Sequence, residues 1–191
     1  METVLRIDEN TFQLFSNKTR QFQKNTYFCT IKYSFSQTKP LSENDMINES
    51  YTCYDFKRKT RFLFESEGDQ GKNLKMILFS HLEFDEWNLG FGDVKGGRID
   101  DSIVSNNNDA KKVFHTVAKA TYAFFDEYPN SVVVIKPIDN RRKSVYNRIF
   151  QRSFDDIDLA FHVIGVIDGH EEAYNPQKIY DNFKIMLKFG L

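Results

Sequence analysis

The segment DAKKVFHTVAKATYAFFDEYPNSVVVIKP (residues 109–137) decides the fold class of this chain. Its first part places apolar residues at helical spacing, at Val113, Val117, Thr121 and Phe124. This spacing predicts an amphipathic helix from about residue 108 to residue 128. Pro129 ends that helix, and the apolar run SVVVIKP (131–137) predicts a short buried strand. The helix therefore permits a crossover between an earlier strand of a sheet and this one.

Strand-like segments precede the helix. Residues 22–37 alternate apolar and polar side chains, as a half-buried strand does. Residues 54–68 and 72–84 predict two further strands, and the sequence GDQG (68–71) between them supplies the glycines of a tight hairpin. Residues 86–101 predict a fourth strand, whose glycines indicate a bulge or a close backbone approach.

A second helix, from about residue 141 to residue 154, and two strands at 159–169 and 182–189 complete the pattern. The predicted order is β-β-β-β-α-β-α-β-β. We therefore expect an α+β fold, with two main helices on a twisted, mostly antiparallel sheet.

The length favours a single domain over residues 1–191. Within it, residues 51–191 are expected to form the core, and residues 1–50 an N-terminal strand or extension.

The composition is that of a globular protein. The chain has a formal net charge of −1, 40% apolar residues, 19 Phe and 9 Tyr. Such an aromatic content argues against global disorder, and the balanced charge favours a protein partner over a nucleic acid. No apolar run approaches the roughly 18 residues of a membrane span, and the N-terminus does not resemble a signal peptide. We therefore expect a cytoplasmic protein that binds no membrane.

The sequence has no recognised catalytic or metal-binding motif. Its two cysteines, Cys29 and Cys53, cannot form a disulfide framework, and no Cys or His spacing is typical of zinc. Neither a nucleophile elbow nor a P-loop is present. These observations favour a protein without enzymatic activity, metal or cofactor.

Five motifs in the second half of the chain resemble an uncharacterised family of small bacterial proteins. The resemblance covers roughly residues 61–189 and implies one structural unit, with no activity to transfer. The motifs are NLxFGD (88–93), IDDxxxSNNxD (99–109), KVxxTVAxxxxxFxxxYP (112–129), RxxxY (142–146) and, more loosely, NYxxFxI (179–185).

The order of elements also resembles part of the GNAT acyltransferases. VVVIKPIDNRRKSVYNRIFQRSF (132–154) is similar to that family's strand-then-helix segment, with Asn140, Tyr146 and Phe154 at matching positions. The resemblance implies acetyl-coenzyme A as the cofactor and Tyr146 as the general acid. The family's glycine-rich pyrophosphate loop has no counterpart, because the equivalent stretch SIVSNNNDAKKV has no glycine and places Asp109 at the phosphate position.

Two polar clusters are candidate binding sites. The acidic turn before the first helix is suited to oxygen coordination or acid–base chemistry, but turns and N-caps use the same residues. The arginines of the second helix suit an anion or an acidic partner, but such a helix face is also commonly solvated. We expect either a polar pocket formed by Asn106, Asn107, Arg142 and Tyr146, or a salt bridge from Arg142 to Asp100 or Asp101 that ties the turn to the helix. The candidate binding residues are Asp100, Asp101, Asn106, Asn107, Arg141 and Arg142, and Tyr146 is the candidate catalytic residue.

Two functional hypotheses remain open at this point. The first is an interaction or regulatory domain, for example a component of a toxin–antitoxin or phage-defence locus, with a protein partner or a second copy of itself. The second is a divergent GNAT-like acyltransferase that uses Tyr146.

Overall fold

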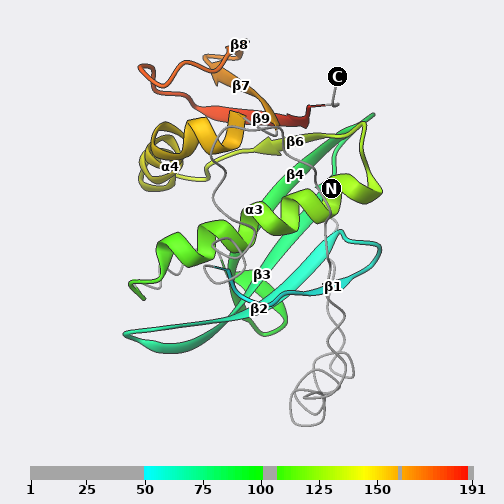
Figure 1. Cartoon of the computed structure of the whole chain (residues 1–191), viewed down its shortest axis with the longest axis vertical. Coiled ribbons are helices and arrows are strands. Elements are labelled where there is room, and N and C mark those ends of the chain that lie inside the picture. Colours follow the sequence, from blue (N-terminus) through cyan, green and yellow to red (C-terminus); the bar gives the residue numbers. More distant parts are fainter. Residues whose placement is uncertain (1–49, 101–106, 159–160, 189–191) are drawn as a thin grey trace, which may run out of the picture.

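The computed structural model of the chain describes residues 50–100, 107–158 and 161–188. These residues form two helices and one nine-stranded sheet (Figure 1), which confirms the α+β class and the predicted order of elements. The strands are β1 (Tyr54–Phe56), β2 (Arg61–Gly68), β3 (Gly71–His81), β4 (Glu86–Lys95), β5 (Arg98–Asp100), β6 (Val132–Ile135), β7 (Phe161–Ile167), β8 (His170–Ala173) and β9 (Asn182–Leu187). The helices are α3 (Ala110–Glu127) and α4 (Asn140–Asp158).

The sheet is mostly antiparallel, with the strand order β1-β2-β3-β4-β6-β9-β7-β8. Its one parallel pair in the described chain joins Glu86–Asn88 of β4 to Val132–Val134 of β6. Helix α3 makes this pairing possible, because it returns the chain to the end of the sheet at which β4 begins. Strand β5 pairs with the opposite end of β4, at Asp93–Lys95.

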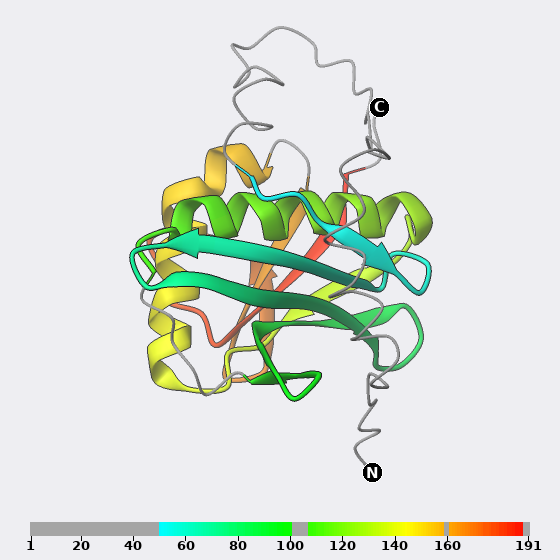
Figure 2. The same ribbon diagram turned by 90° about the horizontal axis from the view of Figure 1, so that it is seen from below.

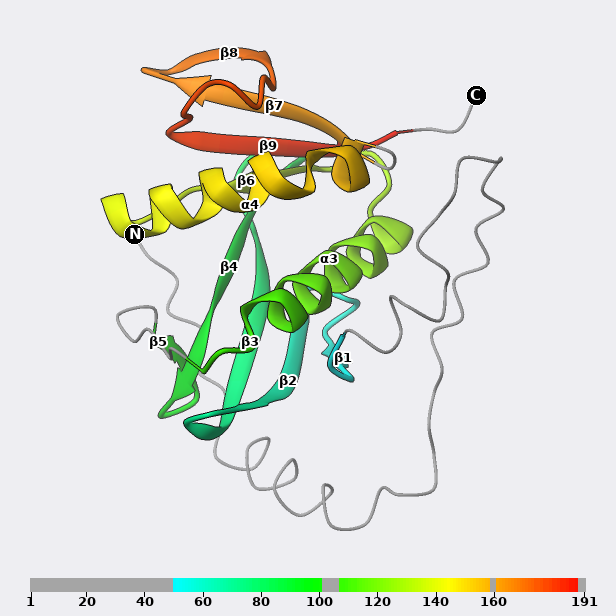
Figure 3. The same ribbon diagram turned by 60° about the vertical axis from the view of Figure 1, so that its left-hand side comes forward.

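Both helices cover the same face of the sheet. Phe124 of α3 stacks on Phe79 of β3, and Phe150 of α4 stacks on Phe183 of β9. The register of the paired strands places Phe79 and Phe183 on one face. Accordingly, Figure 2 shows α3 along one side of β2 and β3, and Figure 3 shows α4 beside β6 and β9. A core rich in aromatic rings fills the space between the two layers.

The structure divides two of the predicted strands. The segment 54–68 contains a turn over residues 57–60, where Lys57, Arg58 and Lys59 all have left-handed φ angles near 50–58°. The segment 86–101 folds back on itself at Gly96 and Gly97, whose positive φ angles suit a tight turn. Strand β8 was not predicted, because all four of its residues are exposed and leave no apolar pattern.

The predicted strand at 22–37 lies outside the described residues. Among the residues that the structure describes, neither helix combines the length and the apolar character that a membrane span requires.

Candidate functional site

The sequence-predicted binding residues that the structure describes take separate structural roles. Asn107 is 1% exposed, and its side chain closes the turn between β2 and β3. Its Oδ1 accepts a hydrogen bond from the backbone N–H of Gln70 at 2.6 Å, and its Nδ2 donates to the carbonyl of Gly71 at 3.0 Å. A Cβ atom on Gly68 would lie 1.8 Å from the carbonyl oxygen of Asn107, so only glycine fits there. Asn107 therefore anchors a hairpin.

The acidic part of the predicted site is only partly described. Asp100 ends β5, opposite Asp93 of β4. Asp101 and Asn106 lie outside the described residues. Asp93 itself is buried and pairs with the buried ammonium of Lys75.

The predicted residues of α4 lie at its start and along its length. Arg142 donates hydrogen bonds to Asp139 through its backbone N–H, at 2.7 Å, and through its guanidinium. These bonds, the backbone one above all, lower the pKa of the Asp139 carboxyl. Arg141 is exposed, and Tyr146 is half-buried against the core. The structure therefore ties Arg142 to the beginning of its own helix and Asn107 to the β2–β3 turn, without bringing the two together.

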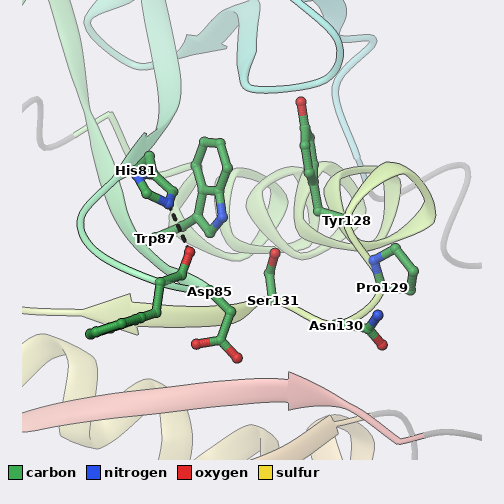
Figure 4. A pocket seen from close by; sticks show the side chains of 8 residues that line it. His81, Asp85, Trp87, Tyr128, Pro129, Asn130 and Ser131 are labelled. Atoms are coloured by element: carbon green, nitrogen blue, oxygen red, sulfur yellow. Dashed lines mark hydrogen bonds between the residues drawn. The ribbon is translucent and has the colours of Figure 1, made fainter.

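A different group of side chains forms a recess at the opposite end of β3. The β3–β4 turn, the end of α3 and the start of β6 meet here around a hollow of about 320 Å³ that opens widely to solvent (Figure 4). We call this hollow the aromatic recess. It is lined by His81, Phe84, Asp85, Trp87, Tyr128, Pro129, Asn130 and Ser131.

Three rings form one side of the aromatic recess. Trp87 contacts His81 edge to face, with 5.0 Å between the ring centroids, and contacts Tyr128 at the same distance with a tilt of 41°. Trp87 also packs edge to face on the buried ring of Phe124, at 5.3 Å. The recess therefore rests directly on the hydrophobic core, and its rings are held in place from below.

Local sequence explains how the chain turns at this site. Tyr128 caps the C-terminal end of α3: its N–H donates to the carbonyl of Phe124 at 2.9 Å, and Pro129 cannot continue the helix. Pro129 and Asn130 are the two central residues of a turn that is closed by the N–H of Ser131, which donates to the carbonyl of Tyr128 at 3.1 Å. This turn delivers Ser131 to the edge of the recess.

Polar groups at the recess are available to a ligand. Ser131 is only 7% exposed, and its hydroxyl points toward Trp87 and Tyr128 in Figure 4. Within the described part of the chain, neither this hydroxyl nor the indole N–H of Trp87 has a hydrogen-bond partner. The carboxylate of Asp85 likewise has no ion pair with any described residue. A recess with both donors and acceptors unused is suited to binding.

Phe84 is the most unusual residue of the recess. Its side chain is 90% exposed, and its φ angle of +49° lies in the left-handed region, where a bulky residue is a rare exception. The imidazole of His81 donates from Nε2 to the carbonyl of Phe84 at 2.8 Å, which supports this turn conformation. Neither burial nor backbone preference explains a phenylalanine here, and such residues gather at functional sites.

The comparisons with known proteins place this chain in a family. The model of DUF6934, described as a family of unknown function, matches residues 47–188. The chain belongs to this family. No curated protein and no solved structure matches the chain. The DUF6934 match covers both helices and every strand described here, so the aromatic recess lies within the family region.

Cys53 is the free cysteine that the structure describes in this DUF6934 member. Burial raises the pKa of the Cys53 thiol to about 12, so that it stays protonated at neutral pH. Among the described residues, no three His, Cys, Asp or Glu side chains gather as a metal site.

None of the sequence-predicted site residues that the structure describes lines the recess. Leu82 and Phe84 alternate with Glu83 and Asp85 at the end of the predicted strand 72–84, and both apolar side chains are exposed in the structure. Large apolar residues beside acidic ones, where one predicted strand gives way to the next, are the sequence signal that indicates a functional turn here.

Proposed function

We propose that this protein is an interaction domain that docks a protein partner through the aromatic recess. The observation that carries this proposal is the side chain of Phe84. It is almost fully exposed to solvent, at the edge of an open hollow, on a residue with a left-handed backbone conformation. Aromatic residues are enriched among the anchors of protein interfaces, because they bury a large area at a small entropic cost.

The composition of the recess supports a protein partner. Trp and Tyr are the residues most often found at interface hot spots, and Trp87 and Tyr128 adjoin each other here. Leu82, 52% exposed, precedes Phe84 by two residues and extends the apolar surface beyond the hollow. The hollow is also small and open, whereas small-molecule sites enclose most of their ligand.

Peptide selection tests the proposal. A random dodecapeptide library displayed on phage is selected on the full chain, and the peptides obtained are titrated against it by tryptophan fluorescence. Trp87 is the chain's only tryptophan, so its emission reports on the recess alone. Phe84→Ala should weaken binding about ten-fold or more, as interface anchors do.

Ile179→Ala is the matched control, because Ile179 is a 57% exposed apolar side chain outside the recess. It should leave the affinity unchanged. Peptides that bind both variants equally, or a selection that yields no binder, would reject the docking function.

A second candidate is a divergent GNAT-like acyltransferase with Tyr146 as general acid. The order of elements favours it, because α3 connects the parallel strands β4 and β6 and α4 follows at once. Against it, Asn107 and Asp109 before α3 are engaged with the β2–β3 turn and with the hydroxyl of Tyr51, where the family would hold pyrophosphate. Calorimetric titration with acetyl-coenzyme A separates the two candidates, since an interaction domain should give no binding heat.

The setting that we propose for the interaction domain is a toxin–antitoxin or phage-defence locus in the cytoplasm. The identity of the neighbouring gene tests this setting, and sedimentation of the purified chain tests whether the partner is a second copy.

A further inference from the structure

We propose that the aromatic recess binds one arginine side chain of the partner protein. This inference rests on the proposed docking function and adds the chemistry of the group that enters the hollow.

The charges around the recess favour a cation. The lining includes the carboxylate of Asp85 and no lysine or arginine. Exposed Glu83 and Glu127 adjoin lining residues in the chain and add two further negative charges. A positive side chain would therefore approach a surface whose potential attracts it.

The neighbouring lysines do not cancel this potential. Lys184 is shared by Glu86 and Glu171, at 2.5 and 2.7 Å, so this cluster carries a net negative charge. Lys59 lies 3.7 Å from Asp126, which balances it. The carboxylate of Asp85 is left without a cationic partner among the described residues.

The rings select a planar cation. Cations are attracted to the faces of aromatic rings, and Trp is the best of these partners. A guanidinium group is flat, more weakly hydrated than an ammonium, and able to stack on a ring while its N–H groups donate in its own plane. Asp85 and the unused hydroxyl of Ser131 offer the acceptors for those N–H groups. The same arrangement suits lysine less well, because an ammonium is a compact, strongly hydrated charge.

The size and the surroundings of the recess indicate a side chain instead of a free small molecule. Its volume of about 320 Å³ lies at the lower end of the range of roughly 300–1,000 Å³ for ligand pockets. A free ligand there would remain largely in water. A protein segment adds contacts with the exposed side chains of Leu82 and Phe84 outside the hollow, and so gains affinity that the hollow alone does not supply.

Substituted peptides test this inference. The probes are the dodecapeptides selected on the full chain, each resynthesised with citrulline, which keeps the shape of arginine and removes its charge, or with lysine. The readouts are Trp87 fluorescence and the single indole N–H resonance of the protein. Citrulline should weaken binding at least about five-fold, and lysine should restore only part of the loss.

Asp85→Asn should lower the affinity for the arginine peptide by about three- to ten-fold and leave the affinity for the citrulline peptide unchanged. The matched control is Asp69→Asn, which neutralises an exposed carboxylate in the turn at the other end of β3. It should alter neither affinity.

The outcomes separate this inference from the docking function. Peptides that depend on Phe84 but contain no arginine, or that bind equally well with citrulline or lysine, would overturn the arginine assignment and leave the docking function standing. If no selected peptide depends on Phe84, both proposals fall.

Discussion

The ring of Phe124 in α3 stacks on the ring of Phe79 in β3, with 4.1 Å between their centroids and 11° between their planes. Trp87 and Tyr128, two rings of the aromatic recess, pack against the same Phe124 ring at 5.3 and 4.9 Å. Phe124 itself is fully buried. One core residue thus joins the helix to the sheet and also supports the candidate site from below.

Phe124→Ala should lower the free energy of unfolding by roughly 3–5 kcal/mol, because it removes a buried ring and leaves a cavity. Urea denaturation followed by circular dichroism measures the change. Ile138→Ala, at a side chain that is 61% exposed, should change stability by less than about 0.5 kcal/mol. A loss below about 1 kcal/mol for Phe124→Ala would show that this ring does not anchor α3.

Asn147→Ala should cost roughly 2–4 kcal/mol, because it leaves two buried backbone groups without partners. The Asn147 side chain, 2% exposed, accepts from the N–H of Tyr180 and donates to its carbonyl, both at 2.8 Å. These bonds attach α4 to the chain that enters β9. Gln151→Ala, one turn further along α4 and exposed, is the control and should have little effect in the same urea titration.

The sequence was informative wherever one periodicity dominated a long segment. Helix α3 is visible because its apolar positions repeat over five turns, and Thr121 and Phe124 of that pattern are buried. In α4 the apolar pattern is a poor guide to burial, because the apolar Val145 is 42% exposed whereas the polar Asn147 is buried. A polar residue that satisfies distant backbone groups leaves no periodic signal.

The candidate site was hidden for a related reason. Its residues come from two segments, 81–87 and 128–131, that only the crossover through α3 and the parallel pairing of β4 and β6 bring together. The first segment contains no motif, and the second contains only the final Tyr-Pro of the motif at 112–129. The polar clusters that did stand out were used locally, as Arg142 shows by pairing with Asp139 three residues earlier.

Gly165→Ala should destabilise the protein by about 1–3 kcal/mol or more, as overpacked core positions do. A Cβ atom at Gly165 would lie 2.1 Å from the ring of Tyr180, which is fully buried and cannot move aside. Gly90→Ala is the matched control on β4, because its nearest neighbour would be at 3.7 Å, an ordinary contact. If thermal unfolding gives the same midpoint for both variants, this close packing is contradicted.

The stability that Asp181 contributes should disappear in acid. The hydrogen bond from Lys143, and then that from the N–H of Asp168, lower the pKa of the Asp181 carboxyl below its usual 3.8. A group whose pKa is lowered by folding stabilises the protein above its unfolded pKa, and this contribution is lost as the pH falls through the folded pKa. Asp181→Asn should therefore be less stable than the wild type at neutral pH, and the difference should shrink below pH 3.8.

Denaturation midpoints across the acid range measure this difference. Asp69→Asn serves as the comparison, because the exposed carboxylate of Asp69 has no hydrogen bond or ion pair with another described residue. Its effect should not depend on pH in the same way. If the difference in stability between the wild type and Asp181→Asn stays constant down to the lowest pH, the ionised Asp181 carboxylate does not stabilise the protein through its pair with Lys143.

Phe84→Asn should stabilise the protein by about 0.5–1 kcal/mol, because asparagine tolerates a left-handed conformation that costs other residues roughly 1–2 kcal/mol. Because the Phe84 ring is 90% exposed, its removal loses almost no buried apolar area. The same variant should lose the binding of selected peptides, so stability and docking would move in opposite directions. Urea titration and peptide titration of one preparation measure both. A variant that is destabilised by more than about 1 kcal/mol would show that the ring supports the fold, and the argument that Phe84 is retained for a partner would then fail.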